Sequence, residues 1–359
     1  MGVIASQSPS GKQFTSIGGQ AVLEGVMMRS PNFVSVAVRR TDSKKIVIKH
    51  DPYSTILRRH SLLAKPILRG VVILVESMIQ GMGALSFSAE IGGEASSEEG
   101  NPSAQKPKSE KLSKTEVVSS MVFAFGMGLL LFVALPHAIT AVLTSDRFLG
   151  ISPKSPIFHL IDGMFKMVIL LGYVWAISQM AEIRRVFQYH GAEHKSIFTF
   201  EAGEDLTVEN ARKYSTLHPR CGTSFLLFLV VISIAMFSIL LPVLGLTNFS
   251  DVAWKNHLGM IVAKMILMFP VAGLAYEVIK VCACRTDNAF FRAVIAPGLL
   301  LQKLTTIEPD DAQLEVALAS LRQCLRLEKS IESPKSGFEV DRLAELFYQP
   351  VAMTEFPEL

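Results

Sequence analysis

Four long apolar stretches constrain this chain more than any other feature of its sequence. They cover residues 117–143, 157–181, 224–246 and 258–281, and each has the roughly 20 apolar residues that a helix needs to cross a bilayer. Half of the 359 residues are hydrophobic and only 19% are charged, which excludes a disordered chain and is low for a soluble domain. We therefore predict a mainly α, polytopic membrane protein with about four transmembrane helices.

The placement of basic residues predicts how these helices are oriented. The loop between the second and third stretches is rich in Lys and Arg, whereas the two shorter connections carry few. By the positive-inside rule this loop is cytoplasmic, and parity then places both termini in the cytoplasm of an inner-membrane protein. The 35 Lys and Arg residues nearly balance the 32 Asp and Glu residues, so we expect the lipid bilayer as a partner and no nucleic acid.

A fifth apolar stretch, residues 62–91, contains Lys65, Arg69, Glu76 and three glycines. A span there would place at least one charge near the middle of the bilayer, which is unfavourable by several kcal/mol. We interpret the stretch as an interfacial or re-entrant helix. The alternative is a fifth span whose charges pair inside the bundle, which would put the N-terminal segment on the other side.

The segments outside the apolar stretches are predicted to form small soluble elements. Apolar and polar residues alternate over 34–39 and 45–50, which predicts a β-hairpin, and residues 17–28 are expected to add a strand or a tight loop. Asp310 and Asp311 are expected to cap a helix with a leucine stripe, and a second short helix is expected near 340–348. The predicted organisation is an N-terminal β-hairpin-containing domain (1–61), the interfacial or re-entrant helix (62–91), a flexible linker (92–116), a transmembrane hairpin (117–181), a cytoplasmic loop (182–223), a second transmembrane hairpin (224–281) and a C-terminal amphipathic cytoplasmic tail (282–359).

The cytoplasmic loop begins with a pattern that is typical of metal sites. His190, Glu193 and His194 form HxxEH, and on a helix these three side chains project near one face. The pattern is the reverse of HExxH, in which two histidines bind zinc and the glutamate takes a proton from water on the metal. A catalytic zinc needs a third protein ligand and keeps one position open, whereas a structural zinc has four protein ligands.

Candidates for the further ligands lie in the same loop. His218 and Cys221 are separated by two residues and can reach one ion across a turn, and Glu201 is an acidic alternative. Both histidines of HxxEH with His218 and Cys221 would close a structural site, whereas the two histidines with a carboxylate or His218 would leave a catalytic position. The other interpretation is that these histidines are solvated groups or cap a helix end.

Ionisable residues inside the apolar stretches include Lys166, Lys264 and Glu277. Buried ionisable groups in a membrane indicate an ion path or a substrate contact, so a small transporter is a further function to consider. Lys264 and Glu277 are ~20 Å apart along one helix and cannot pair. We expect each of them to reach the headgroups by snorkelling.

Long strings of the chain resemble the YqhQ-like family of bacterial and plastid membrane proteins, over roughly residues 17–321. The strings are GGQAVLEGVMMR (18–29), YHGAEHK (189–195), LTVENAR (206–212), HPRCGTSF (218–225) and TTIEP (305–309). The family is defined as a domain of unknown function and is described as predicted metal-dependent enzymes. The resemblance therefore implies a metal site built from the HxxEH residues with His218 and Cys221, and it supplies no substrate.

The sequence favours a zinc-dependent hydrolase at the cytoplasmic membrane surface. In this hypothesis His190 and His194 bind zinc, His218 or Glu201 completes the ligand set, and Glu193 accepts a proton from zinc-bound water. Arg220 is expected to stabilise an oxyanion, and the expected substrate is a peptide or a lipid-linked group. The alternatives are a non-catalytic scaffold or assembly factor with a structural zinc, and a small transporter.

Overall fold

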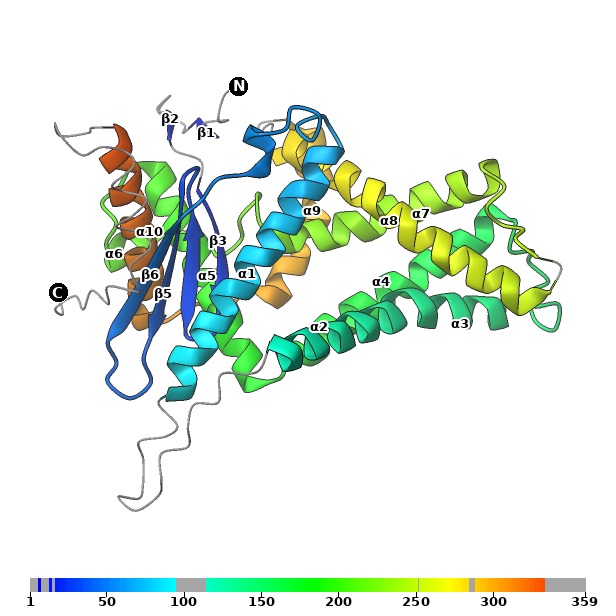
Figure 1. Cartoon of the computed structure of the whole chain (residues 1–359), viewed down its shortest axis with the longest axis horizontal. Coiled ribbons are helices and arrows are strands. Elements are labelled where there is room, and N and C mark those ends of the chain that lie inside the picture. Colours follow the sequence, from blue (N-terminus) through cyan, green and yellow to red (C-terminus); the bar gives the residue numbers. More distant parts are fainter. Residues whose placement is uncertain are drawn as a thin grey trace, which may run out of the picture.

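The bundle of long apolar helices lies at one end of this molecule, and the β-sheet lies at the other (Figure 1). The computed structural model describes residues 6–7, 13–14, 17–94, 114–250, 252–283 and 288–332. The second short helix predicted near 340–348 and most of the predicted linker at 92–116 lie outside the described residues.

The apolar stretches form a bundle of four long helical rods, which confirms the predicted fold class. The first rod is continuous through α2 (Lys114–Leu129), the π-helical turn η3 (Leu130–Ala134) and α3 (Leu135–Leu143). The other rods are α4 (Pro156–Ser178), α7 (Gly222–Val243) and α8 (Ala253–Ala283). A fifth long helix is α1 (Leu68–Glu94). Each of these five helices is long enough and apolar enough to cross a membrane, so the chain is a multi-pass membrane protein.

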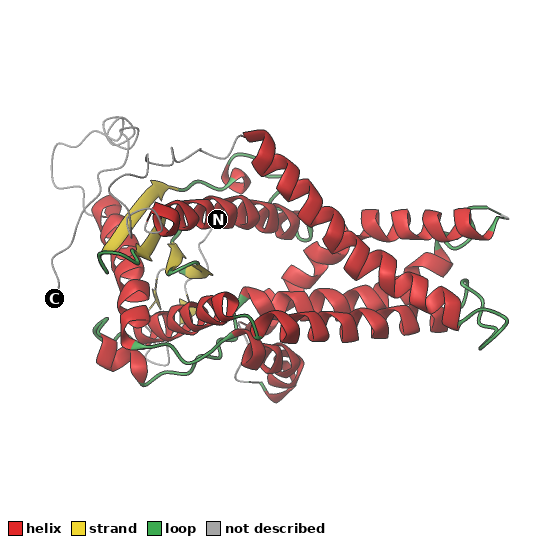
Figure 2. Ribbon diagram, turned by 90° about the horizontal axis from the view of Figure 1, so that it is seen from below, coloured by secondary structure: helices red, strands yellow, loops and turns green. Residues whose placement is uncertain are grey.

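The loops of the bundle divide into two groups. Those joining α3 to α4 and α7 to α8 lie at the end away from the sheet, and the other ends of the four rods lie beside the sheet (Figures 1 and 2). The start of α2, the end of α4, the start of α7 and the end of α8 therefore lie at the same end of the bundle. This arrangement is the one that four spans with both termini on one side require, and the assignment of that side to the cytoplasm stays a prediction.

The predicted β-hairpin is part of a four-stranded antiparallel sheet. Strands β3 (Gly18–Val22), β4 (Gly25–Arg29), β5 (Phe33–Arg39) and β6 (Ile46–Pro52) pair in sequence order, and the short strands β1 (Ser6–Gln7) and β2 (Gln13–Phe14) pair separately. Residues 17–28 thus supply two further strands, joined by a tight turn in which Glu24 has a φ of 51°. Successive side chains of a strand face opposite sides, so each face of the sheet presents its own apolar set.

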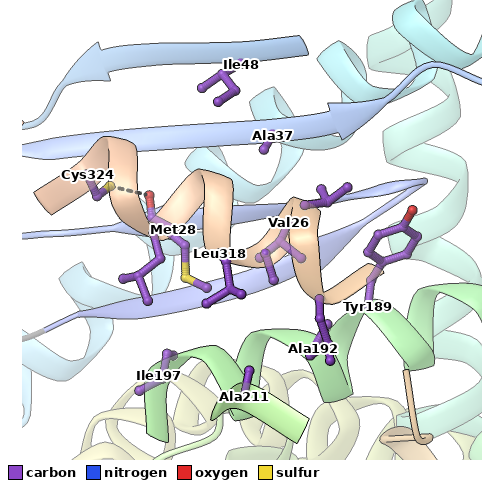
Figure 3. Close-up of a cluster of buried hydrophobic side chains, with 14 residues drawn as sticks. Val26, Met28, Ala37, Ile48, Tyr189, Ala192, Ile197, Ala211, Leu318 and Cys324 are labelled. Atoms are coloured by element: carbon purple, nitrogen blue, oxygen red, sulfur yellow. Dashed lines mark hydrogen bonds between the residues drawn. The ribbon is translucent and has the colours of Figure 1, made fainter. Parts of the chain in front are cut away.

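Two helices cover one face of the sheet. They are α5 (Ala181–Ala202) and α10 (Asp311–Glu332), and Figure 3 shows Val26, Met28 and Ala37 of the sheet facing Ala192 of α5 and Leu318 of α10. The leucine stripe predicted for residues 310–325 is therefore the buried face of α10. The N-terminal sheet and the start of the C-terminal tail, which the sequence presents as separate segments, share one hydrophobic core.

The start of α10 is fixed as the sequence predicts. The Asp310 carboxylate accepts the backbone N–H of Gln313 at 2.8 Å, and the Gln313 side chain accepts the backbone N–H of Asp310 at 2.9 Å. This reciprocal pair is a capping box, which satisfies two of the amide groups that a helix start leaves unpaired. Three shorter helical elements complete the structure: η1 (Ile56–Arg58), α6 (Val208–Arg212) and α9 (Ala289–Thr305).

Helix α1 covers the opposite face of the sheet and runs across, rather than along, the four rods (Figure 1). Ala84 and Ile91 of α1 pack with Val22, Met27 and Val38 of the sheet. On the other side of α1, a row of large apolar side chains is exposed: Leu68, Val75, Met78, Ile79, Met82 and Leu85. A helix that binds a sheet with one face and exposes an apolar face on the other is suited to lie in the membrane interface.

The charges of α1 have partners. The Glu76 carboxylate accepts hydrogen bonds from Tyr53 at 2.9 Å and from Thr55 at 2.8 Å, so it faces the sheet domain. Arg69 forms an ion pair with Glu277 near the end of α8. The helices meet closely there, because a Cβ on Gly273 of α8 would lie 2.3 Å from the Ile67 carbonyl oxygen. Glu277 is therefore held by a neighbouring helix.

The interfacial placement of α1 stays a prediction, and it can be tested by depth measurements. Leu68, Val75 and Met82 lie on one exposed face at successive steps of about 10 Å along the helix axis. A fluorophore on a cysteine introduced at each position, one at a time, is expected to be quenched equally by shallow nitroxide lipids in liposomes, with labelled unsubstituted protein as background. A depth that changes steadily from position 68 to 82 would instead establish a fifth span.

Candidate metal centre

The two histidines of HxxEH lie on one face of α5. This helix runs without interruption from Ala181 to Ala202 and ends at Gly203, whose φ of 73° suits a glycine. Residues four apart lie one above the other on a helix, and the ring centroids of His190 and His194 are 4.4 Å apart. Both side chains are buried, which does not support the interpretation as solvated groups at a helix end.

Cys221 brings a sulfur to the same place from another part of the chain. It is the residue before α7, and its Sγ accepts the backbone N–H of Thr223 as the helix cap. The His190 Nε2 to Cys221 Sγ distance is 3.1 Å, and the donor atoms of His190, His194 and Cys221 all lie within 4.8 Å of one another. Ligands at usual zinc bond lengths, ~2.0–2.3 Å, lie ~3.3–3.7 Å apart in a tetrahedron, so small side-chain adjustments suffice.

Backbone carbonyls fix the orientation of both imidazole rings. The Nδ1 atom of His190 contacts the Thr305 carbonyl oxygen at 2.8 Å, and Nδ1 of His194 contacts the Thr216 carbonyl oxygen. A carbonyl oxygen can only accept, so each Nδ1 carries a proton, and the neutral ring has its lone pair on Nε2, which in His190 faces Cys221 Sγ. Metal-binding histidines are oriented in this way. The buried Nε2 of His194 meets the criteria for no hydrogen bond within the described part of the chain and lies near Cys221, so this atom suits the role of a metal ligand.

His218 lies beside this set with the opposite tautomer. The backbone N–H of Arg220 donates to Nδ1 of His218 at 3.3 Å, so the neutral ring carries its proton on Nε2, which faces the Glu201 carboxylate at 3.7 Å. Glu201 in turn forms an ion pair with Arg220. Of the candidates from the sequence, the structure thus brings His190, His194 and Cys221 together, and it places His218, Glu201 and Arg220 next to them as a second group.

Glu193 is enclosed between α5 and the sheet. Its side chain is 5% exposed, and the backbone N–H of Gly19 in β3 donates to its carboxylate. A Cβ at position 19 would lie 2.8 Å from Oε1 of Glu193, so only glycine leaves room for this carboxyl group. Burial raises the pKa of Glu193 above its ordinary value, against the opposing effect of His190 and His218, as expected for a carboxyl group in an apolar site.

Burial favours the neutral form of His194 and of His218. Burial lowers the pKa of His194, and burial lowers the pKa of His218 to about 4. A neutral imidazole is the form that binds a metal ion. The electrostatics of the centre therefore agree with its geometry.

Gln302 of α9 is a positioning residue that the sequence analysis did not single out. Its side-chain carbonyl accepts the backbone N–H of His218, and its amide donates to the His218 carbonyl oxygen and to Ser224 Oγ, all at 2.8 Å. It is fully buried. These three bonds hold the turn that carries Cys221 into α7. A single glutamine in an apolar segment gives no sequence signal for this role.

Comparisons with known proteins bear on this centre. The profile of a family described as "Protein of unknown function (DUF1385)" matches residues 65–327, which include every residue of the centre except Gly19. The chain is 35% identical over 324 residues to a protein of Bacillus subtilis (strain 168) described as "Uncharacterized protein YqhQ", and the match covers 87% of this chain and 92% of that protein. No solved structure matches the chain.

Proposed function

Because this chain belongs to the DUF1385 family, whose description names no activity, we propose its function from the metal centre: a zinc-dependent hydrolase that acts at the membrane surface. One observation carries the proposal. The Nε2 of His194 lies in a buried site with the lone pair of His190 Nε2 and the Cys221 sulfur, and this donor set suits zinc.

In the proposed site, His190, His194 and Cys221 hold the metal. The ligand set differs from the sequence expectation in its third member, which is Cys221 in place of His218 or Glu201. A zinc ion with three protein ligands has one position left for substrate or water and supplies a Lewis acid that makes water nucleophilic near neutral pH. Thr305 and Thr216 keep the two rings aimed through their carbonyl oxygens.

Glu193 is the proposed proton acceptor. It is three residues from His190 and one from His194 on the same helix, and it is buried beside both His190 and His218. A carboxylate in this position takes the proton of the attacking water and returns it to the leaving group. The burial that raises its pKa brings it closer to the pH at which such a group works best.

The second group supplies the proposed contacts to substrate. The Nε2–H of His218 is buried and makes no hydrogen bond to the residues that the structure describes, although it faces the Glu201 carboxylate at 3.7 Å. In the proposed mechanism it donates to a developing oxyanion. Arg220, which is paired with Glu201, is the second candidate for this role. The site lies at the start of α7, where the chain enters the bundle, so the proposed substrate is a peptide or a lipid-linked group at the cytoplasmic surface.

A structural zinc is the alternative, and one observation favours it. His218 is 5.5 Å from His194 between ring centroids, and rotation of its ring would bring in a fourth ligand. That rotation would give up the hydrogen bond from the Arg220 amide. With four protein ligands on the zinc, the proposed function would be a non-catalytic scaffold or assembly factor instead of a hydrolase.

Metal removal distinguishes the two functions. We expect zinc-loaded protein in nanodiscs to hydrolyse members of a panel of peptide and lipid-linked amides and esters, to lose this activity on treatment with a chelator, and to regain it with added zinc. The thermal unfolding temperature, measured in parallel, is expected to change little. A large fall in that temperature on chelation, with no hydrolysis of any panel member by the zinc-loaded protein, would establish the structural zinc.

A further inference from the structure

A second polar cluster lies inside the helical bundle. Asp162 and Lys166 of α4, Lys264 of α8 and His137 of α3 are each 5% exposed or less. Both ammonium groups bond the same carboxylate oxygen, because Oδ2 of Asp162 lies 2.6 Å from Lys264 Nζ and 2.9 Å from Lys166 Nζ. The snorkelling predicted for Lys264 is therefore wrong, since its ammonium group turns inward to Asp162.

The cluster carries one more positive charge than negative charge. One carboxylate faces two ammonium groups, and neutral imidazoles add no charge. Among the described residues, the other groups packed around the cluster do not balance the excess charge: α4 adds His159, and α7 adds the ring of Phe237, whose centroid is 5.4 Å from Lys166 Nζ. An unbalanced charge in an apolar bundle is strongly unfavourable. Loss of one proton would make the cluster neutral.

A hydrogen-bonded path leads from Lys264 to the end of the bundle. Lys264 Nζ lies 3.1 Å from His137 Nδ1, and His137 Nε2 lies 3.1 Å from Nδ1 of His257. His257 is half-buried and lies only ~6 Å from the start of α8, at the end away from the sheet. Because Lys264 donates to Nδ1 of His137, this ring carries its proton on Nε2 and donates it to His257.

We propose that the cluster is a reversible one-proton site, reached through the two imidazoles from the compartment at the far end of the bundle. On release, the Nζ–H bond of Lys264 breaks and an Nδ1–H bond forms on His137. The Nε2–H bond of His137 breaks and an Nδ1–H bond forms on His257. His257 then gives its Nε2 proton to water. Lys264 ends as a neutral amine, both rings have exchanged tautomers, and the cluster is neutral.

Two further features support a proton as the ligand. The Oδ1 atom of Asp162 and both ring nitrogens of His159 have no hydrogen-bond partner in the described ranges, so the cluster has polar capacity for an arriving proton or a bound water. Towards the sheet, the bundle is closed by the apolar side chains of Leu170, Val174 and Leu227. Within the described residues the hydrogen-bonded path ends at the cluster, so the proposed site binds protons without conducting them across the membrane.

Nitrogen NMR of the full chain in bilayers, labelled with ¹⁵N on lysine and histidine, tests this proposal. We expect one lysine Nζ signal to change from ammonium to amine between pH 5 and 10, and two histidines to change tautomer over the same interval. Lys264→Met is expected to abolish all three changes. Lys166→Met is the matched comparison: it removes the excess charge, so Lys264 is expected to remain an ammonium group over the whole range.

A third variant separates the path from the site. His257→Phe leaves the Lys264 to Asp162 contact in place and interrupts the relay, so exchange of the Lys264 protons with D₂O is expected to slow at least tenfold while the lysine signal still appears. A lysine signal that stays ammonium to pH 10 in the unsubstituted protein would overturn the proposal, and so would histidine changes that persist in Lys264→Met.

Discussion

Replacing His194 with alanine is expected to remove zinc from the purified protein. The change deletes one of three proposed ligands, the one whose Nε2 has no other hydrogen-bond partner within the described part of the chain. Loss of an outer-shell partner alone typically weakens metal binding 10–100-fold, so we expect loss of a ligand to weaken it by at least about 100-fold. Elemental analysis measures the amount of zinc bound per chain, and competition with a chromophoric chelator measures the affinity for zinc.

His218→Ala is the matched control for this prediction. It removes a second buried imidazole from the same site, 5.5 Å from His194 between ring centroids, but one whose Nδ1 already accepts the Arg220 amide. We expect His218→Ala to keep zinc at full stoichiometry. Equal loss of zinc from both variants would show that His218 is a fourth ligand, and the structural alternative would then replace the hydrolase.

Replacing Glu193 with glutamine is expected to leave zinc in place and to slow hydrolysis strongly. The two side chains have nearly the same shape, and the glutamine oxygen can still accept the Gly19 amide. What is lost is the ability to take and return a proton, which typically contributes 10²–10⁴-fold to a rate. We expect a fall of that size in kcat, measured on any panel substrate that the unsubstituted protein cleaves.

Glu201→Gln serves as the control for the lost carboxylate. Glu201 lies in the same site but is bound to Arg220 and faces His218, so we expect its neutralisation to change activity much less. The Glu193→Gln variant must also retain its thermal unfolding temperature, which shows that the buried site is intact. Full activity in Glu193→Gln would remove Glu193 from the mechanism.

The features predicted correctly from the sequence depend on local periodicity. Alternation over 34–39 and 45–50 identified β5 and β6, and the spacing of leucines after Asp310 identified α10 with its cap. The packing of α10 on the sheet could not be predicted in this way. It joins residues almost 300 positions apart, as in the contact of Cys324 with the Met28 carbonyl oxygen. An amphipathic pattern in the sequence does not show which other element the apolar face packs against.

The metal centre shows the same division. HxxEH and the nearby cysteine were visible in the sequence because helical spacing fixes which side chains share a face. The proposed choice of Cys221 over His218 as third ligand cannot be made from the sequence, because it depends on the His218 tautomer and thus on one backbone amide. The carbonyl oxygens that orient the rings, from Thr305 and Thr216, are backbone atoms and have no signature in the sequence.

The sequence shows that charged residues lie inside the bundle, but it does not show which residues they pair with. Spacing in the sequence tests pairing along one helix only, and Lys264 and Glu277 cannot meet in that way. In the structure each pairs with another helix, Lys264 with Asp162 of α4 and Glu277 with Arg69 of α1. Asp162 was not singled out because it stands in the first turns of an apolar stretch.

The central claim is that His190, His194 and Cys221 bind one metal ion, and X-ray absorption spectroscopy at the zinc edge of the purified protein tests it most directly. The predicted result is one zinc per chain with two nitrogen ligands at about 2.0–2.1 Å, one sulfur at about 2.3 Å and one further light atom. The sulfur contribution is expected to vanish in Cys221→Ser. Zinc without a sulfur ligand, or protein that binds no zinc at all, would contradict the account.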